Sequence, residues 1–265
     1  MIRFLKKLIK FTAAKTGILT LLNKLRIFSF KKYLLELRIS RVQNIKQLRR
    51  LARDNKNTYF LDYDLQIDTK IREFTNSIKA FDIDLNNKVI LDIGTGTSDS
   101  LDCALKMGAL ETYFIDSDIY FDKFAKLKGH KGLLRDYMIK PYFPEYWRKK
   151  FDVIYTKGSI NCILVNEMEK TKASSDFSFD EWVMAIKSLL KKEGKIILLP
   201  AMGKQSMRII DEKYDLDTFY WCDDVESFRQ SYFTKTLLNN GFKIHENIEG
   251  VNQSKAFPFL YYYQK

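Results

Sequence analysis

Apolar and polar positions recur with two different periods along the chain, and the change of period divides it near residue 60. Residues 2–13, 18–28 and 31–53 repeat apolar side chains every three to four positions, which predicts three amphipathic helices. Beyond them, short apolar runs alternate with helical stretches, the pattern of an α/β domain. We therefore expect a basic helical segment, residues 1–60, followed by one α/β domain, residues 61–265.

The apolar runs of the second part predict strands that alternate with helices. Strands are expected at residues 89–91, 112–115, 132–137, 151–155 and about 191–200, with a last pair at 242–247 and 257–263. Helices are expected at residues 62–80, 98–107, 118–128, 179–190 and 233–240. Such an alternation favours a parallel sheet with helices on its faces.

A glycine turn follows the first predicted strand. Gly94 and Gly96 allow a ligand to approach the backbone closely, and free N–H groups at the start of the next helix face that ligand. Asp116 closes the second strand, 20 residues after Gly96, where a carboxylate can accept hydrogen bonds from ribose hydroxyls. A dinucleotide site would require a third glycine at position 99, and the chain has Asp99, whose charge would repel a pyrophosphate. The turn therefore predicts an adenosine-containing ligand that tolerates nearby acidic groups.

The stretch from Asp92 to Ser98 resembles the first motif of class I S-adenosylmethionine-dependent methyltransferases, with Ser98 at the third small position. Residues 151–155, FDVIY, resemble the fourth strand of that family, and residues 239–244, NNGFKI, are typical of its C-terminal part. The resemblance covers about residues 87–265. It implies a Rossmann-like methyltransferase fold, a mostly parallel seven-stranded sheet with an antiparallel last strand, and S-adenosylmethionine as cofactor.

The resemblance also implies where the cofactor binds. Asp136 matches the aspartate that commonly binds the adenine amino group in the family, and Tyr137 would cover the adenine ring. The expected cofactor site consists of residues at four strand ends: Asp92, Gly94, Thr95, Gly96, Asp116, Ser117, Asp136, Tyr137 and Thr156.

The acceptor side allows two chemistries. A sugar hydroxyl would need a general base, for which Asp176, Tyr155 and Tyr137 are the candidates. An anionic acceptor would need no base, and Lys157 could position it by charge. Tyr155, Lys157 and Asp176 are thus the predicted catalytic residues. The aromatic and acidic segment 202–230 is predicted to be a lid over the acceptor.

Charge is concentrated in the N-terminal segment. Residues 1–60 hold 16 Lys or Arg against two acidic residues, whereas the other 205 residues hold 29 basic and 31 acidic ones. The longest uncharged run of the segment, residues 16–23, is far shorter than the ~20 residues that span a bilayer. Three interpretations remain open: residues 1–30 bind an anionic membrane surface, the segment binds nucleic acid, or its helices pack on the domain or join a dimer.

Composition bears on the compartment and on the function. Three cysteines and two histidines suggest neither a disulfide framework nor a metal site, so we expect no metal and a cytoplasmic protein, peripheral at the inner face of the membrane if the basic segment binds there. His130 is predicted to lie at the surface. The leading hypothesis is a methyltransferase for an oxygen of a small-molecule or glycan acceptor, as in surface-polysaccharide biosynthesis. The alternatives are an RNA methyltransferase and a non-catalytic partner subunit.

Overall fold

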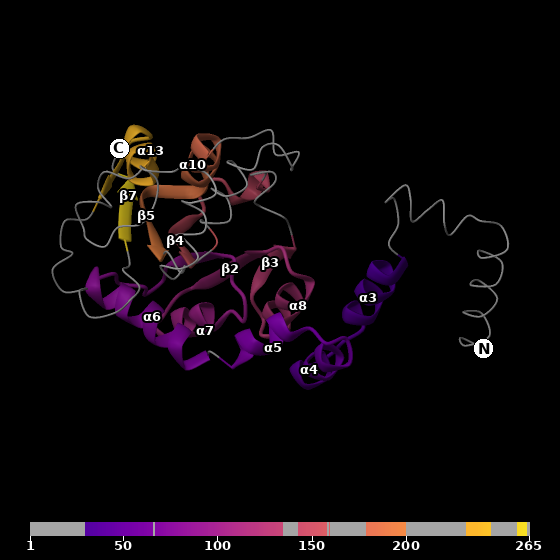
Figure 1. The fold of residues 1–265 in the computed structure, drawn as a ribbon. Helices are drawn as coiled ribbons and strands as arrows, with labels where there is room; N and C mark the ends of the chain where they lie inside the picture. Colours follow the sequence, from indigo (N-terminus) through magenta and orange to yellow (C-terminus); the bar gives the residue numbers. More distant parts are fainter. Residues whose placement is uncertain are drawn as a thin grey trace, which may run out of the picture. The chain divides into compact units, whose positions relative to one another are not determined.

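The computed structural model describes residues 30–65, 67–134, 143–157, 159, 179–199, 232–244 and 259–263 (Figure 1). The chain divides into two compact units, Met1–Leu51 and Ala52–Lys265. The predicted helices at residues 2–13 and 18–28 lie outside the described residues. Among the helices that are described, none is long and apolar enough to cross a membrane.

The single helix predicted over residues 31–53 is wrong, because the chain forms two helices there. Four residues, 41–44, separate helix α3 (Phe30–Ser40) from helix α4 (Ile45–Asp54). Asn44 starts the second helix, since its side-chain Oδ1 accepts the N–H of Gln47 at 3.0 Å. The Gln47 side chain in turn accepts the N–H of Gln43 at 2.9 Å, which completes a reciprocal cap.

The lead-in to the first strand is likewise two helices instead of one. Helix α5 (Thr58–Asp64) is capped by Asn57, whose Oδ1 accepts the N–H of Phe60 at 3.0 Å. Helix α6 (Ile67–Ala80) follows after a short break. The break brings both helices close to the glycine turn, as shown below.

The α/β architecture predicted from the alternating pattern is confirmed. Five strands run parallel in the order β3-β2-β1-β4-β5, and β7 and β6 extend the sheet beyond β5. Strand β7 is antiparallel to both of its neighbours. The strands are β1 (Val89–Ile93), β2 (Glu111–Asp116), β3 (Lys131–Leu134), β4 (Phe151–Lys157), β5 (Leu190–Leu199), β6 (Phe242–Ile244) and β7 (Phe259–Tyr263).

Helices cover both faces of this sheet, and each face has its own core. On one face α6, α7 (Asp99–Lys106) and α8 (Ile119–Leu127) pack through residues such as Phe74, Leu101 and Ala125. On the other face α10 (Phe179–Leu189) and α13 (Tyr232–Asn239) contribute residues such as Trp182 and Leu237. The strands between them are almost continuously apolar because both of their faces are buried.

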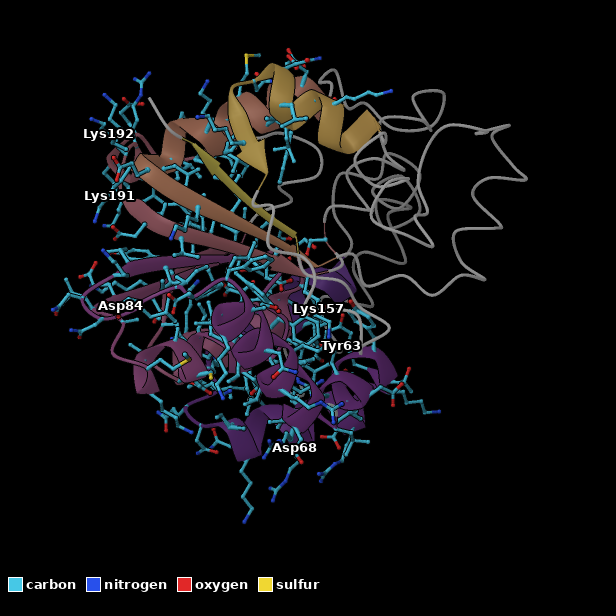
Figure 2. The ribbon with its side chains drawn as sticks, turned by 90° about the vertical axis from the view of Figure 1, so that its left-hand side faces the viewer. Tyr63, Asp68, Asp84, Lys157, Lys191 and Lys192 are labelled. Carbon is cyan, nitrogen blue, oxygen red and sulfur yellow. The ribbon has the colours of Figure 1, made fainter. Side chains whose placement is uncertain are left out.

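The topology determines where a ligand can bind. Strands β2 and β3 lie on one side of β1, and β4 lies on the other, so the order reverses between β1 and β4. In open parallel sheets, ligands bind at the carboxyl ends of the strands beside such a reversal. Figure 2 shows Lys157 at this edge, where β4 ends, and Lys191 and Lys192 at the opposite edge, where β5 begins.

Candidate functional site

The glycine turn joins β1 to α7 through three left-handed residues. The φ angles of Gly94, Gly96 and Ser98 are +75°, +55° and +55°. The N–H of Gly94 donates to the carbonyl oxygen of Ile115 on β2 at 2.8 Å, which fixes the start of the turn. At Gly96, a Cβ atom would lie 3.0 Å from the ring of Tyr63, so both the backbone angle and the packing require glycine there.

Asp92, in β1, holds the turn through hydrogen bonds. Its side chain is buried, and one oxygen accepts the hydroxyl of Thr95 at 3.2 Å together with the hydroxyl of Ser100. Burial raises the pKa of Asp92 to about 6, although the two hydroxyls and Lys70 oppose that rise. Asp92 and Thr95, both predicted cofactor residues, therefore contact each other within the turn.

Asp116 joins the end of β2 to the same turn. Its Oδ2 accepts the N–H of Gly96 at 3.0 Å, and its Oδ1 accepts the N–H of Asp118 at 2.8 Å. Burial raises the pKa of Asp116 to about 7 despite these two hydrogen bonds. The neighbouring Ser117 is exposed. The predicted acidic residue and the predicted glycine turn thus form one site, which sequence spacing alone did not establish.

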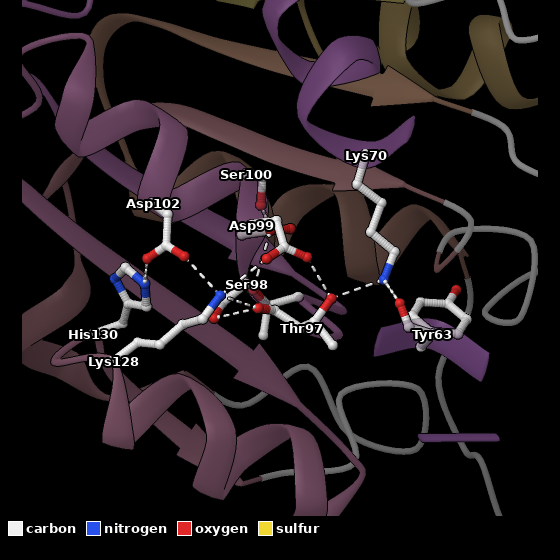
Figure 3. Close-up of polar contacts among 11 residues, drawn as sticks. Tyr63, Lys70, Thr97, Ser98, Asp99, Ser100, Asp102, Lys128 and His130 are labelled. Atoms are coloured by element: carbon white, nitrogen blue, oxygen red, sulfur yellow. Dashed lines mark hydrogen bonds and ion pairs between the residues drawn. The ribbon is translucent and has the colours of Figure 1, made fainter. Parts of the chain in front are cut away.

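Asp99 does not play the part that its position in the sequence suggested. We predicted an acidic group facing the ligand, but Asp99 is buried and bound by the protein itself. Its carboxylate accepts the hydroxyl of Thr97 at 2.5 Å and forms an ion pair with Lys128 at 2.9 Å (Figure 3). Lys128 also donates to the carbonyl oxygen of Thr97 and to Asp102. Its charge therefore offsets two carboxylates at the start of α7.

The prediction that His130 lies at the surface is wrong. His130 is buried, and its two ring nitrogens lie 2.8 Å from the hydroxyl of Thr112 and 2.9 Å from Asp102 (Figure 3). The residue comes directly before β3 and not in an open loop. Burial opposes ionisation of Asp102, but hydrogen bonds from His130 and Lys128 outweigh it and lower the pKa of that carboxyl.

Three predicted residues lie at the end of β4 and differ in their surroundings. Tyr155 is buried in the core with its ring 5.0 Å from that of Phe74, and burial raises its pKa well above the usual range. These surroundings do not suit a general base. The hydroxyl of Thr156 is buried without a hydrogen-bond partner among the described residues. Lys157 is half-buried and forms an ion pair with Glu73 of α6.

Several predicted residues lie outside the described residues, namely Asp136, Tyr137, Asp176 and the predicted lid 202–230. Within the described ranges, no group of His, Cys, Asp and Glu side chains is arranged to hold a metal ion.

Residues that the sequence interpretation missed come mainly from α5 and α6. Lys70 and Glu73 lie three positions apart on α6, and both reach the carboxyl edge of the sheet. A signal for Lys70 was present, because it precedes Phe74, Ile78 and Phe81 at helical spacing and so interrupts an otherwise buried apolar stripe. No comparable signal identified Lys128, whose partners lie 26 to 31 residues away.

Comparison with known proteins finds similar structures but no similar sequence family. No family model matches the sequence, and no curated protein matches it significantly. Solved structures do match. A chain from the complex between the Haloferax volcanii Trm112 methyltransferase activator and a methyltransferase has a TM-score of 0.53 and 11% identity, over 81% of this chain and 98% of that one.

Two further structures are similar at lower scores. Phosphoethanolamine N-methyltransferase 2 from Haemonchus contortus gives a TM-score of 0.48 and 14% identity, over 73% of this chain and about half, 52%, of that one. A Methanococcus maripaludis protein described as an S-adenosylmethionine-dependent methyltransferase gives a TM-score of 0.47 and 14% identity, over 85% of this chain and 95% of that one. At such identities the likeness concerns the fold alone, and that fold is the Rossmann-like fold of class I methyltransferases.

Proposed function

We propose that the protein is an S-adenosylmethionine-dependent methyltransferase. The observation that carries the proposal is the hydrogen bond from the N–H of Gly96 to the Asp116 carboxylate. This hydrogen bond joins the acidic end of β2 to the glycine turn, in a chain whose fold is that of methyltransferases. An ionised Asp116 can accept hydrogen bonds from ribose hydroxyls, and the left-handed turn leaves main chain near the ligand. When bound, the cofactor supplies an activated methyl group on a positively charged sulfur.

The residue at position 99 departs from a dinucleotide site. Such a site requires a third glycine there, whereas this chain has Asp99, which is buried and bound by Lys128 and Thr97. Asp92, in β1, is buried as well. The buried hydroxyl of Thr156, which has no hydrogen-bond partner among the described residues, offers a further hydrogen bond at the neighbouring strand end. Asp136 and Tyr137 remain predicted contacts of the adenine.

The proposed acceptor is a small molecule or a glycan, methylated on oxygen. Support comes from charge, because residues 61–265 carry nearly equal numbers of acidic and basic groups, unlike a nucleic-acid channel. Lys157 and Glu73 form the polar pair at the acceptor side of β4, where Lys157 can position an anionic group. Asp176 stays a predicted base, and a role in surface-polysaccharide biosynthesis stays a prediction.

Ligand binding tests the proposal directly. We expect S-adenosylmethionine and S-adenosylhomocysteine to raise the melting temperature of the full chain, and NAD to leave it unchanged. Asp116→Ala should abolish the rise, while Glu111→Gln, at the other end of β2, should preserve it. A wild-type protein that responds to NAD alone, or to none of the three, would refute the proposed function.

A further inference from the structure

Lys70 is a buried ammonium group beside the glycine turn. Only 8% of the residue is exposed, and its Nζ would lie 3.8 Å from a Cβ atom on Gly96. The Nζ donates to the hydroxyl of Thr97 at 2.9 Å and to the carbonyl oxygen of Tyr63 at 3.1 Å (Figure 3). It also lies 3.8 Å from the centre of the Tyr63 ring. Helix α5 and the glycine turn therefore both hold the ammonium group in place.

This ammonium group retains one donor for a ligand. A lysine ammonium carries three N–H donors, and the two acceptors named above leave the third without a hydrogen-bond acceptor among the described residues, apart from the face of the Tyr63 ring. No carboxylate of the described residues lies within ion-pair distance of it. The nearby Asp99 is bound by Lys128 and Thr97, and Asp92 is bound by two hydroxyls. Within the part of the chain that the structure describes, a positive charge is thus buried next to bare main chain without a carboxylate at ion-pair distance.

We propose that Lys70 binds the carboxylate at the amino-acid end of the cofactor. The inference rests on the proposed function. Two groups of opposite charge lie close to Gly96, because Asp116 accepts its N–H and the Lys70 Nζ lies 3.8 Å from the position that a Cβ atom would take there. A ligand whose ribose hydroxyls donate hydrogen bonds to Asp116 would extend across the turn toward Lys70. Its carboxylate would give the buried ammonium the anionic partner that the described residues do not provide.

Binding through Lys70 makes cofactor affinity depend on pH. Burial, together with the nearby charge of Lys157, lowers the pKa of Lys70 to about 8, although Asp99, Asp92 and Asp64 oppose the change. A carboxylate binds the protonated amine, so the contribution of Lys70 to affinity should be full below about pH 8 and fall by up to about tenfold per unit above it. The fall should be absent for a ligand without a carboxylate.

Two nucleosides that differ in the amino-acid end test this inference. S-Adenosylhomocysteine carries the carboxylate, and 5′-methylthioadenosine has the same adenosine and sulfur without it. By titration calorimetry near pH 7, the wild-type chain should bind the former at least about tenfold more tightly. Lys70→Met should remove most of that preference and leave 5′-methylthioadenosine affinity within about twofold. Lys79→Met, an exposed lysine on the same helix, should change neither affinity.

The outcomes separate the two proposals. If Lys70→Met keeps the preference, or weakens both nucleosides equally, Lys70 does not bind the carboxylate. If the wild-type chain binds neither nucleoside, the proposed function itself fails. Lys70→Arg provides a second test that does not depend on the methionine variant folding. Because arginine stays charged, this variant should keep the preference near pH 9.5, where the wild-type chain loses it.

Discussion

Two buried aspartates at the site have raised pKa values, yet their hydrogen bonds give them different roles. Within the described residues, Asp92 accepts the side-chain hydroxyls of Thr95 in the turn and of Ser100 in α7, so it stabilises the turn and the start of that helix. Asp116 accepts main-chain N–H groups from two segments, and each of its oxygens keeps acceptor capacity for a ligand. Ligand recognition is therefore expected to follow the ionisation of Asp116.

At low pH, the affinity for ligand should depend on the ionisation of Asp116. Burial raises its pKa to about 7, and ribose hydroxyls need the ionised form, so affinity for 5′-methylthioadenosine should fall as the pH drops below about 7. The slope should approach tenfold per pH unit. Asp116→Asn should bind at least about tenfold more weakly, with a flat profile between about pH 5.5 and 8 by calorimetry. The prediction is wrong if the wild-type profile is equally flat.

Lys70 should also make the free energy of unfolding depend on pH. The pKa of its ammonium is lowered in the folded chain from 10.5 to about 8, so below about pH 8 the folded state bears the full unfavourable effect of a buried charge. That effect disappears as the pH rises from about 8 to 10.5. Relative to Lys70→Met, the wild-type free energy of unfolding should increase over this range, by up to about 3 kcal/mol. Urea titrations at several pH values measure it, and a constant difference would contradict it.

At the scale of elements, one side chain connects α8 to the glycine turn. Lys128 follows α8 and donates to the carbonyl oxygen of Thr97, to Asp99 and to Asp102, so it fixes the start of α7. Lys128→Met should therefore lower the free energy of unfolding by about 3 kcal/mol, because it leaves two carboxylates without their cation. Cofactor affinity should fall as well, since the turn loses its support.

An ion pair exposed at both ends provides the control. Arg148 pairs with Glu145 at 3.0 Å, and the two side chains are 62% and 84% exposed. Arg148→Met should change stability by less than about 0.5 kcal/mol, because exposed ion pairs contribute little. Equal effects of the two substitutions in chemical denaturation would show that the buried network does not stabilise the turn.

Sequence periodicity predicted the strands well and the helix boundaries less well. A buried strand requires a run of apolar residues, so β1 and β2 were visible in the sequence. Residues 31–53 look periodic throughout, and the break depends on the local cap formed by Asn44 and Gln47. His130 was misplaced because its partners, Thr112 and Asp102, lie 18 and 28 residues away. Local spacing cannot reveal such contacts.

At the scale of the molecule, the fold gathers the site from distant parts of the sequence. The resemblance identified Gly96 and Asp116, whose spacing follows from one strand-helix-strand unit. It did not identify Lys70 or Glu73, because these precede the first strand and reach the site only through the packing of α6. The sequence thus predicted the site residues that belong to the motif, whereas tertiary packing brings Lys70 and Glu73 to the site.

The uneven charge of the chain leads to a prediction about membranes. Residues 1–60 carry a net charge of +14, against about −2 for the rest, so an electrostatic contact should involve the N-terminal segment. Each basic side chain near an anionic surface contributes about 1 kcal/mol, and salt screens the attraction. The full chain should therefore co-sediment with phosphatidylserine-containing vesicles at low salt and detach at high salt.

A charge-reversed variant separates this attraction from other causes. Replacing Lys6, Lys7 and Lys10 by glutamate keeps the chain length but reverses three charges. The net charge of residues 1–60 then falls from +14 to +8, so a smaller fraction of the variant should sediment at the same salt concentration. Its affinity for S-adenosylhomocysteine should match that of the wild-type chain, because the proposed cofactor residues all lie beyond residue 61. Equal sedimentation of both proteins, or equal binding to vesicles of neutral phosphatidylcholine, would contradict an electrostatic contact. Salt-dependent binding to RNA, with none to anionic vesicles, would instead favour nucleic acid as the partner of the segment.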